Sequence, residues 1–266
     1  MELDGIDLEQ KKIKIKMAPT LQELASNHQI NENSGMMIIQ RGENKKGPFL
    51  FCEYDQGYPR PLYRGRVNLM GGAQEFKTVK DGEGKKLKVG FLDYNPWDTM
   101  RREIWEEVKN PKNEKGFASH ALIKDLRNQM QHTLRPIAEY FSVVRVPPRA
   151  DGSGVFDYVS IDTTWLSNLP FELFDEVTNA MKKGRRIINE GNLTQVTVEE
   201  LVSGQRLCAW DSGIMMADYL QAPIPNPNRV IATKFPTANI ARQNYYHYRE
   251  DSLLNYIPLD SMPAMN

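Results

Sequence analysis

Three glutamates in one short segment are the residues of this sequence best suited to do chemistry. They lie in Arg102-Glu103-Ile104-Trp105-Glu106-Glu107, where Glu103, Glu106 and Glu107 are three and four positions apart. In an α-helix such positions share one face, with Cβ atoms about 5 to 6 Å apart. Like charges this close disfavour the helix unless solvent or a cation relieves the repulsion. Because carboxylate oxygens are hard ligands, the spacing indicates a site for Mg²⁺ or Mn²⁺, ions that accompany phosphate substrates.

The same cluster also has an ordinary structural interpretation. Glutamates are common on exposed helices, and Arg102 with Glu106 is an i, i+4 ion pair of the kind found on many surface helices. Two glycines upstream favour the functional interpretation. Gly71 and Gly72 follow a strand expected over 65–70, and glycine lets a backbone turn sharply and approach another group closely. We therefore expect a bend at these glycines, beside the glutamate-bearing helix.

The segment that carries the glutamates has clear helix signals. Asn95 is a good N-cap, Pro96 suits the first helical position, and Asp98 favours the positive end of the helix dipole. Apolar residues then recur at three- and four-residue spacing, which predicts a buried stripe. The stripe consists of Trp97, Met100, Ile104 and Val108.

The elements around this helix indicate an α+β domain. Apolar runs separated by turn residues predict two β-hairpins, over 36–54 and 138–161. A short strand is expected over 186–191. Further helices are expected over 119–132, from 197 onward and over 211–220.

The chain is expected to divide into three parts. Residues 1–35 are polar and basic and are expected to form an arm packing on the main domain. Residues 36–222 form that domain, which is interrupted by an inserted loop, rich in lysine and glycine, at 76–93. Residues 223–266 form a tyrosine-rich tail that either folds back on the domain or docks on a second subunit to make a homodimer.

Composition excludes several classes of partner. The 266 residues include 34 Lys plus Arg and 34 Asp plus Glu, so no overall field attracts the chain to nucleic acid, and long RNA is a poor candidate. No stretch approaches the ~18 apolar residues of a membrane span, and the first residues hold no apolar run typical of a signal peptide. Two cysteines fit a reducing compartment. We therefore expect a cytoplasmic, unprocessed protein.

The order of elements resembles the Nudix hydrolase family. That family's motif is G-x5-E-x7-R-E-U-x-E-E-x-G-U, where U is a bulky aliphatic residue. Gly72 matches the opening glycine, 102–107 matches R-E-U-x-E-E, and Glu75 stands where many members carry an additional glutamate. Three departures are evident. Arg102 is 30 positions after Gly72, where the motif has 14, which gives 16 extra residues; the middle glutamate falls on Tyr94; and Lys109-Asn110 replaces the closing G-U.

The resemblance implies a Nudix-like fold, α+β with a mixed β-sheet between helices. It also implies a metal-dependent pyrophosphohydrolase that cleaves the diphosphate linkage of a small nucleoside diphosphate joined to another moiety. In such enzymes helix glutamates bind divalent ions, and water attacks phosphorus. Nucleotide sugars, dinucleotides, ADP-ribose-like compounds and capped RNA ends are all candidate substrates.

Site roles follow from the same resemblance. Glu103 and Glu107 would bind Mg²⁺ or Mn²⁺ directly, Glu106 would bind directly or through water, and the Gly71 carbonyl could complete the coordination. Arg102 would orient a carboxylate. The catalytic base would be Glu103 or Glu190, the latter in a loop-like Asn-Glu-Gly context.

Two other interpretations stay open. The departures from the motif fit a Nudix-fold nucleotide-binding or regulatory module that has lost turnover. A third interpretation is an unrelated α+β structural protein whose Arg-Glu-Ile-Trp-Glu-Glu arose by chance.

Overall fold

The computed structural model describes residues 15–17, 32–43, 45–80, 82, 86–93, 95–109, 116–189, 191–225, 230–234, 245–248 and 254–257. Its main sheet contains β1 (Ile15–Met17), β2 (Glu32–Arg41), β3 (Phe49–Glu53), β4 (Val67–Asn68), β5 (Met70–Ala73), β8 (Arg135–Val146), β9 (Phe156–Leu169), β10 (Asn192–Val196) and β11 (Val230–Lys234). Two small hairpins are formed by β6 (Phe76–Lys80) with β7 (Lys86–Phe91) and by β12 (Tyr245–Tyr248) with β13 (Leu254–Ile257). The helices are α2 (Pro96–Glu107), α3 (His120–Thr133), α4 (Phe171–Lys182), α5 (Val198–Val202), α6 (Ser212–Leu220) and the short 3₁₀ helix η1 (Pro61–Tyr63).

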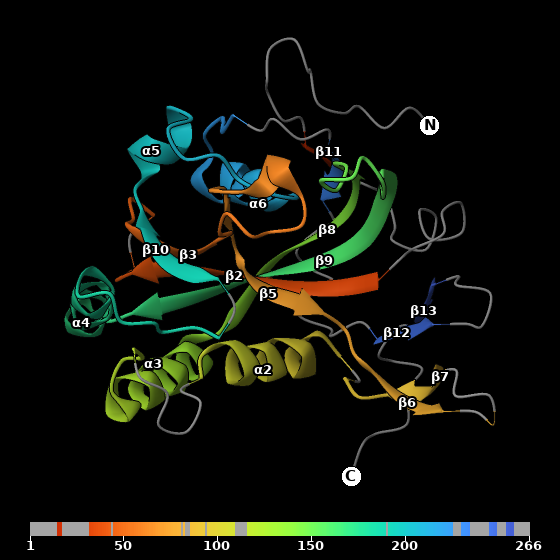
Figure 1. The fold of residues 1–266 in the computed structure, drawn as a ribbon, viewed down its shortest axis with the longest axis horizontal. Helices are drawn as coiled ribbons and strands as arrows, with labels where there is room; N and C mark the ends of the chain where they lie inside the picture. Colours follow the sequence, from red (N-terminus) through yellow and green to blue (C-terminus); the bar gives the residue numbers. More distant parts are fainter. Residues whose placement is uncertain are drawn as a thin grey trace.

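The described strands of the main sheet form a single nine-stranded, mixed sheet (Figure 1). Its order is β1-β11-β8-β9-β2-β3-β10, with β4 beside β3 and β5 beside β2. β2 runs parallel to β9 and β1 parallel to β11, whereas the remaining pairs are antiparallel. β1 comes from the segment expected to be an arm and β11 from the expected tail, and both lie at one edge of this sheet.

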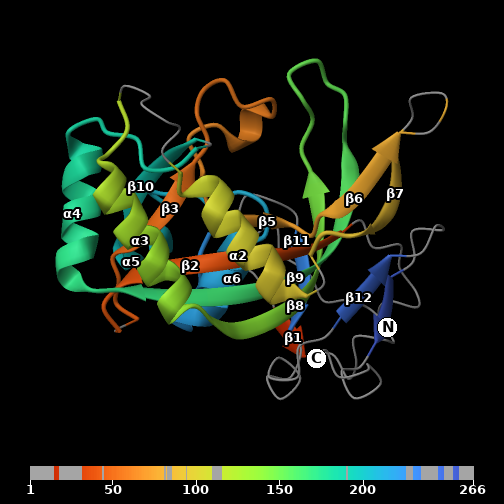
Figure 2. The same ribbon diagram turned by 90° about the horizontal axis from the view of Figure 1, so that it is seen from below.

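Alternation along the central strands builds a hydrophobic core on each face of the sheet, because successive strand residues point to opposite faces. In β2, Met37 and Ile39 pack with α2, α3 and α4, whereas Met36 and Ile38 pack with α5 and α6. Figure 1 shows α5 and α6 over one face and α2 and α3 under the other, and Figure 2 shows α2, α3 and α4 from below. The expected α+β fold with a mixed sheet between helices is confirmed.

Both predicted hairpins are present and longer than expected. β2 pairs with β3 through a turn that contains the cis Gly47–Pro48 bond. β8 pairs with β9 over their whole length, and β9 continues to Leu169. The helices expected over 119–132, from 197 and over 211–220 correspond to α3, α5 and α6.

Three local predictions were wrong. The expected strand over 65–70 is split into β4 and β5, and the second of these runs through the two glycines instead of ending there. Residues 186–189 form only an isolated bridge from Arg186 to Phe117, and the strand of this region is β10. The insertion at 76–93 is not a loop, because β6 and β7 pair into a hairpin that projects from the domain. Its lysines and glycines hid the strand pattern.

Within the described residues, no helix combines the length and apolar character needed to cross a bilayer.

Candidate functional site

The glutamate-bearing segment forms α2 as the sequence predicts. The Asn95 side chain caps the helix by accepting a hydrogen bond of 3.0 Å from the backbone N–H of Asp98. Met100, Ile104 and Val108 are fully buried in the core beneath the sheet. This anchored stripe fixes the rotation of the helix about its axis. Glu103 is therefore held against the sheet, whereas Glu106 stays exposed.

The two glycines of β5 make room for this helix without forming the expected bend. Gly71 pairs with Met36 and Gly72 with Gly35 in the antiparallel β2–β5 ladder. A Cβ atom on Gly72 would lie 2.3 Å from Oε1 of Glu103, and one on Gly71 would lie 1.9 Å from the carbonyl oxygen of Gly35. Glycine is required at both positions by close approach. Only Gly72 is required by the glutamate-bearing helix.

Glu103 is a buried carboxylate with one strong partner. Its residue is 7% exposed, and Oε1 accepts a 2.7 Å hydrogen bond from Nη1 of Arg102. Burial raises the pKa of Glu103, and the charge and hydrogen bond of Arg102 oppose that rise. The arginine therefore favours the ionised carboxylate beside Gly72.

The guanidinium of Arg102 donates hydrogen bonds to several oxygen atoms. Nη1 also donates to Glu106 (2.8 Å), and Nη2 donates to the carbonyl of Ala73 at the end of β5 (2.7 Å). Nε and Nη2 bind Asp93 at 2.8 to 3.1 Å. Burial lowers the pKa of Arg102, but the hydrogen bonds to Asp93 and the charge of Glu103 outweigh burial, so the net pKa is raised. The predicted orienting role of Arg102 toward a carboxylate matches this geometry.

Asp93 is a functional neighbour that the sequence did not reveal. It is 2% exposed, accepts the backbone N–H of Glu75 at 3.0 Å, and accepts a hydrogen bond from Gln74 through its own carbonyl at 2.8 Å. The backbone N–H of Leu92 bonds to Glu75 as well. These contacts close the base of the β6–β7 hairpin. The insertion therefore leaves the strand-to-helix connection compact.

Glu107 lines a cavity of about 190 Å³ whose wall also includes Gly71. We call it the helix-side cavity. Its wall includes Tyr54, Tyr58, Asn68, Met70, Gly71 and Glu107. Gly191 also lines it, and the backbone N–H of Asn189 donates to the Glu107 carbonyl at 2.7 Å. Glu190, the other candidate base, lies outside the described residues, as does Tyr94.

The described residues contain no group of three or more His, Cys, Asp or Glu side chains arranged to hold one metal ion. The three helix glutamates instead separate: Glu103 lies against Gly72, Glu106 bonds to Arg102, and Glu107 faces the helix-side cavity. Mg²⁺ needs no all-protein cage, because it usually keeps several waters and takes one or two carboxylates plus substrate phosphates. Glu103, Glu107 and the backbone at Gly71 fit that requirement.

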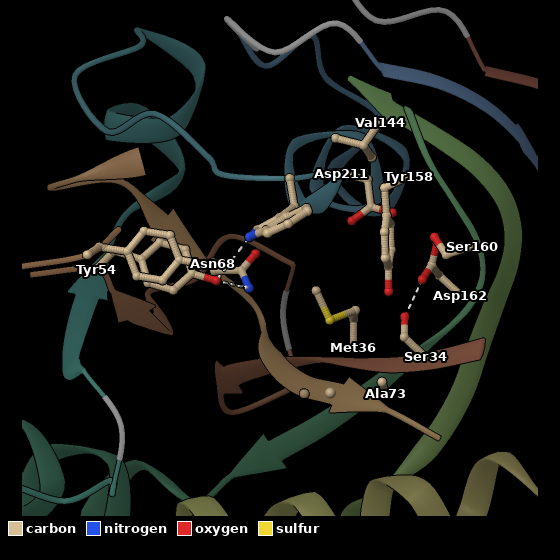
Figure 3. A pocket seen from close by; sticks show the side chains of 14 residues that line it. Ser34, Met36, Tyr54, Asn68, Ala73, Val144, Tyr158, Ser160, Asp162 and Asp211 are labelled. Carbon is tan, nitrogen blue, oxygen red and sulfur yellow. Dashed lines mark hydrogen bonds between the residues drawn. The ribbon is translucent and has the colours of Figure 1, made fainter. Parts of the chain in front are cut away.

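A second cavity of about 240 Å³ adjoins the first on the α6 side of β5 (Figure 3). We call it the aspartate cavity. Its wall includes Tyr54, Tyr58, Tyr158, Asp162, Trp210 and Asp211. Tyr54, Tyr58, Asn68 and Gly71 line both cavities. The two spaces therefore adjoin across the same side chains.

Tyr54 is held between the two cavities. Its ring stacks on Tyr58 with centroids 4.0 Å apart, and its hydroxyl accepts hydrogen bonds from Trp210 (3.1 Å) and Asn68 (3.2 Å). Burial raises the pKa of Tyr54 well above its usual value. Asn68 is fixed in turn by a 2.5 Å hydrogen bond from Ser212. These contacts make the wall shared by the cavities a rigid one.

The sequence gave no sign of this aspartate cavity. Asp162 lies in β9 and Asp211 precedes α6, almost fifty positions apart, and neither belongs to a recognisable motif. One local signal existed: Asp211 occupies a position typical of a helix N-cap. The structure shows that its side chain makes no capping hydrogen bond.

Comparisons with known proteins give a weak structural likeness. No protein-family model matches the chain, and no curated protein sequence does. Among solved structures, Shewanella oneidensis NrtR is similar, with a TM-score of 0.36 and 9% identity over 71% of this chain and 62% of that one. The NUDIX domain of the same protein, complexed with ADP ribose, gives a TM-score of 0.34 and 10% identity over 76% and 97%. The chain thus spans less than two thirds of full-length NrtR. With TM-scores this low, neither likeness supports an inference about what this protein binds.

Proposed function

We propose that this protein is a Nudix-type pyrophosphohydrolase that cleaves the diphosphate linkage of a nucleoside diphosphate joined to another moiety. One relationship carries the proposal. β5 brings Gly72 against Glu103 and places Gly71 in the same cavity as Glu107, so two carboxylates one helical turn apart flank a glycine-lined strand. This arrangement agrees with the order of residues that resembles the Nudix motif.

The chemistry requires a divalent ion, for which Mg²⁺ and Mn²⁺ are the candidates. Glu103, Glu107 and the Gly71 carbonyl would hold it, and the bond from Arg102 to Glu106 favours contact of Glu106 through water. When bound, such an ion stabilises developing charge on the phosphate and activates water. The residues would thus supply two carboxylates and one backbone carbonyl as hard oxygen ligands and leave space for phosphate.

The protein's own residues would do the positioning. Arg102 favours the ionised form of Glu103 against burial and fixes its position, and its bond to the Ala73 carbonyl ties the helix to the end of β5. The stacked Tyr54 and Tyr58 form an aromatic part of the wall of the helix-side cavity. Glu103 and Glu190 stay the two candidates for the base.

A second candidate function is a nucleotide-binding or regulatory module of the same fold without turnover. The observation that favours it is the engagement of both Glu103 and Glu106 by Arg102, which leaves Glu107 as the helix glutamate that opens onto a cavity. The scarcity of cysteine, with only Cys52 and Cys208 in the chain, fits either function in a reducing compartment such as the cytoplasm.

The experiment is a turnover screen of the full chain with Mg²⁺ and with Mn²⁺. The panel contains nucleotide sugars, dinucleotides, ADP-ribose-like compounds and a capped RNA end, with products followed by ³¹P NMR. We expect at least one compound to be cleaved, and we expect Glu107→Gln to remove nearly all of that activity. Glu176→Gln, at an exposed position on α4, is the matched control. Full activity in Glu107→Gln contradicts the assignment, and binding without product favours the regulatory module.

A further inference from the structure

The aspartate cavity contains two buried carboxylates that the proposed hydrolysis leaves without a role. Asp162 is 2% exposed and Asp211 is 5% exposed, yet both line the cavity. Among the described residues neither forms an ion pair with a basic side chain. Buried charges are costly unless they are paired or share a proton. Their presence in a cavity wall therefore needs an explanation.

The hydrogen-bond geometry around Ser142 favours a protonated Asp211. The Ser142 hydroxyl lies 2.5 Å from Oδ2 of Asp162 and 2.7 Å from Oδ2 of Asp211, and its single proton can serve only one of them. Ser160 donates to the same oxygen of Asp162, and Ser34 donates to the other. Asp162 is thus surrounded by hydroxyl donors and acts as a hydrogen-bond acceptor. The contact between Ser142 and Asp211 is also a hydrogen bond when Asp211 carries a proton and donates it to the Ser142 oxygen.

Electrostatics agree with this count. Burial raises the pKa of Asp211 well above its usual value, and the charge of Asp162 raises it further. Asp211 also stands at the N-cap position of α6, where an aspartate ordinarily accepts a backbone N–H, but its side chain makes no such bond. The side chain instead faces Ser142 and the cavity. The pair therefore offers a hydrogen-bond acceptor, Asp162, beside a donor, Asp211.

Aromatic rings form much of the remaining wall. Tyr158 and Trp210 meet edge to face, with centroids 5.7 Å apart at 63°, and Tyr54 stacks on Tyr58. In Figure 3, Asp162, Ser160 and Ser34 gather at one end of the cavity and Tyr54 and Asn68 at the other. Flat heteroaromatic rings stack favourably on such side chains. The cavity thus combines a stacking surface with a donor–acceptor edge.

We propose that the aspartate cavity binds the purine base of a nucleotide whose diphosphate lies beside Glu103 and Glu107. The inference rests on the proposed function for the position of the diphosphate. Size favours a purine, because a cavity of about 150 Å³ already holds benzene and this one measures about 240 Å³. A purine edge presents an N–H donor next to an acceptor, which complements Asp162 and Asp211. The residues shared by the two cavities let one ligand occupy both.

The test measures binding without turnover, by calorimetry of the full chain in the absence of divalent ions. The probes are ADP, GDP, UDP and pyrophosphate. We expect ADP or GDP to bind about tenfold or more tightly than UDP and pyrophosphate, because the smaller uracil ring stacks on less of the aromatic wall and pyrophosphate has no base to satisfy the buried acceptor. The preferred purine is then compared with its edge-methylated analogue, N6,N6-dimethyl-ADP or O6-methyl-GDP. The analogue should lose about tenfold in affinity.

Substitutions of Asp162 and Asp211 test whether these two aspartates cause the preference for purines. Asp211→Asn keeps a neutral donor and should keep the purine preference, whereas Asp211→Ala and Asp162→Asn should abolish it. Asp175→Asn, an exposed position on α4, is the control. If the cavity variants fail to fold by circular dichroism, the methylated analogues on the natural protein decide alone.

The outcomes separate the two proposals. Equal affinity for purine, pyrimidine and pyrophosphate overturns the purine site, as does an undiminished preference in folded Asp211→Ala. If purines bind selectively but no diphosphate is hydrolysed, the proposed hydrolase fails and the purine site stands. If hydrolysis occurs with no preference for a base, the hydrolase stands and the purine site is rejected.

Discussion

Arg102 donates hydrogen bonds from Nε and Nη2 to the carboxylate of Asp93, at 2.8 to 3.1 Å, at the base of the β6–β7 hairpin. Both side chains are largely buried, at 12% and 3% exposure. The arginine that holds Glu103 thus also anchors the segment that leads from β5 to α2. Sixteen residues beyond the motif spacing are accommodated because the hairpin is closed at its base by the hydrogen bonds of Glu75 with Leu92 and Asp93. The insertion therefore need not displace the helix from the strand.

Asp93→Asn should destabilise the protein and loosen the site together. The substitution leaves Arg102 with Glu75, Glu103 and Glu106 as remaining carboxylate partners, so we expect a loss of about 3 kcal/mol, at the lower end for a broken buried pair. Urea denaturation measures it. Asp175→Asn breaks an exposed ion pair with Arg41 and serves as the control, with no measurable change expected. Equal effects of the two variants would show that Asp93 has no special role.

The adjacent glycines of β5 should respond differently to alanine. In Gly71→Ala the new Cβ meets backbone at Gly35, which cannot move aside, so we expect a loss of at least about 3 kcal/mol in stability. In Gly72→Ala the new Cβ meets the end of the Glu103 side chain, which can turn away. That variant should stay folded but lose about 100-fold in kcat, because small displacements of a positioned group are costly. Thermal unfolding and the turnover screen separate the two effects.

Local sequence signals were sufficient to predict most of the helices and strands. The cap at Asn95 and the apolar stripe through Met100 and Ile104 predicted α2 correctly, because both depend only on neighbouring residues. The alternation in β2 predicted a strand, although its parallel pairing with β9 depends on residues more than a hundred positions away. Propensity failed at 76–93, where lysine and glycine concealed a hairpin that is held by its base.

The site was predictable to the same limited extent. Spacing on the helix singled out Glu103 and Glu107 as candidates and predicted the i, i+4 pair of Arg102 with Glu106, whereas the contact of Arg102 with Asp93 depends on how strand, hairpin and helix meet. The sequence predicted a bend at Gly71 and Gly72, but both residues lie within strand β5. Glycine is needed there because Gly35 approaches Gly71 closely and Glu103 approaches Gly72 closely. Pairing between distant residues such as Asp162 and Asp211 has no signature in a single sequence.

Cys208 should be unreactive in the folded protein. It is fully buried, and burial raises the pKa of its thiol to about 12, so almost no thiolate exists at neutral pH. Cys52 is only partly buried. Titration with a chromogenic disulfide at pH 8 should therefore label Cys52 alone, and Cys208 should react after addition of denaturant. Rapid labelling of Cys208 in Cys52→Ser without denaturant would contradict the packing around it.

Asp211 should make stability depend on pH in a defined direction. Its folded-state pKa lies above the value of about 3.9 expected in the unfolded chain. Between those two values the native state binds more protons than the unfolded state, so its stabilising contribution is present at low pH and is lost as pH rises through the folded pKa. Asp162 and the hydroxyls of Ser142 and Tyr63 face it, and the only carboxylate among these is Asp162.

Asp211→Asn keeps a donor in the pair but does not ionise. Its Tm should therefore match that of the natural protein near pH 4 and exceed it by a few degrees at pH 8, at about 2 to 4 °C per kcal/mol for a chain of this size. Differential scanning calorimetry across pH 4 to 8 gives the comparison, with Asp175→Asn as the control that should show no such trend. A Tm difference that is constant over this range would mean that Asp211 does not hold a proton in the folded protein, because only a group whose pKa changes on folding can produce the divergence.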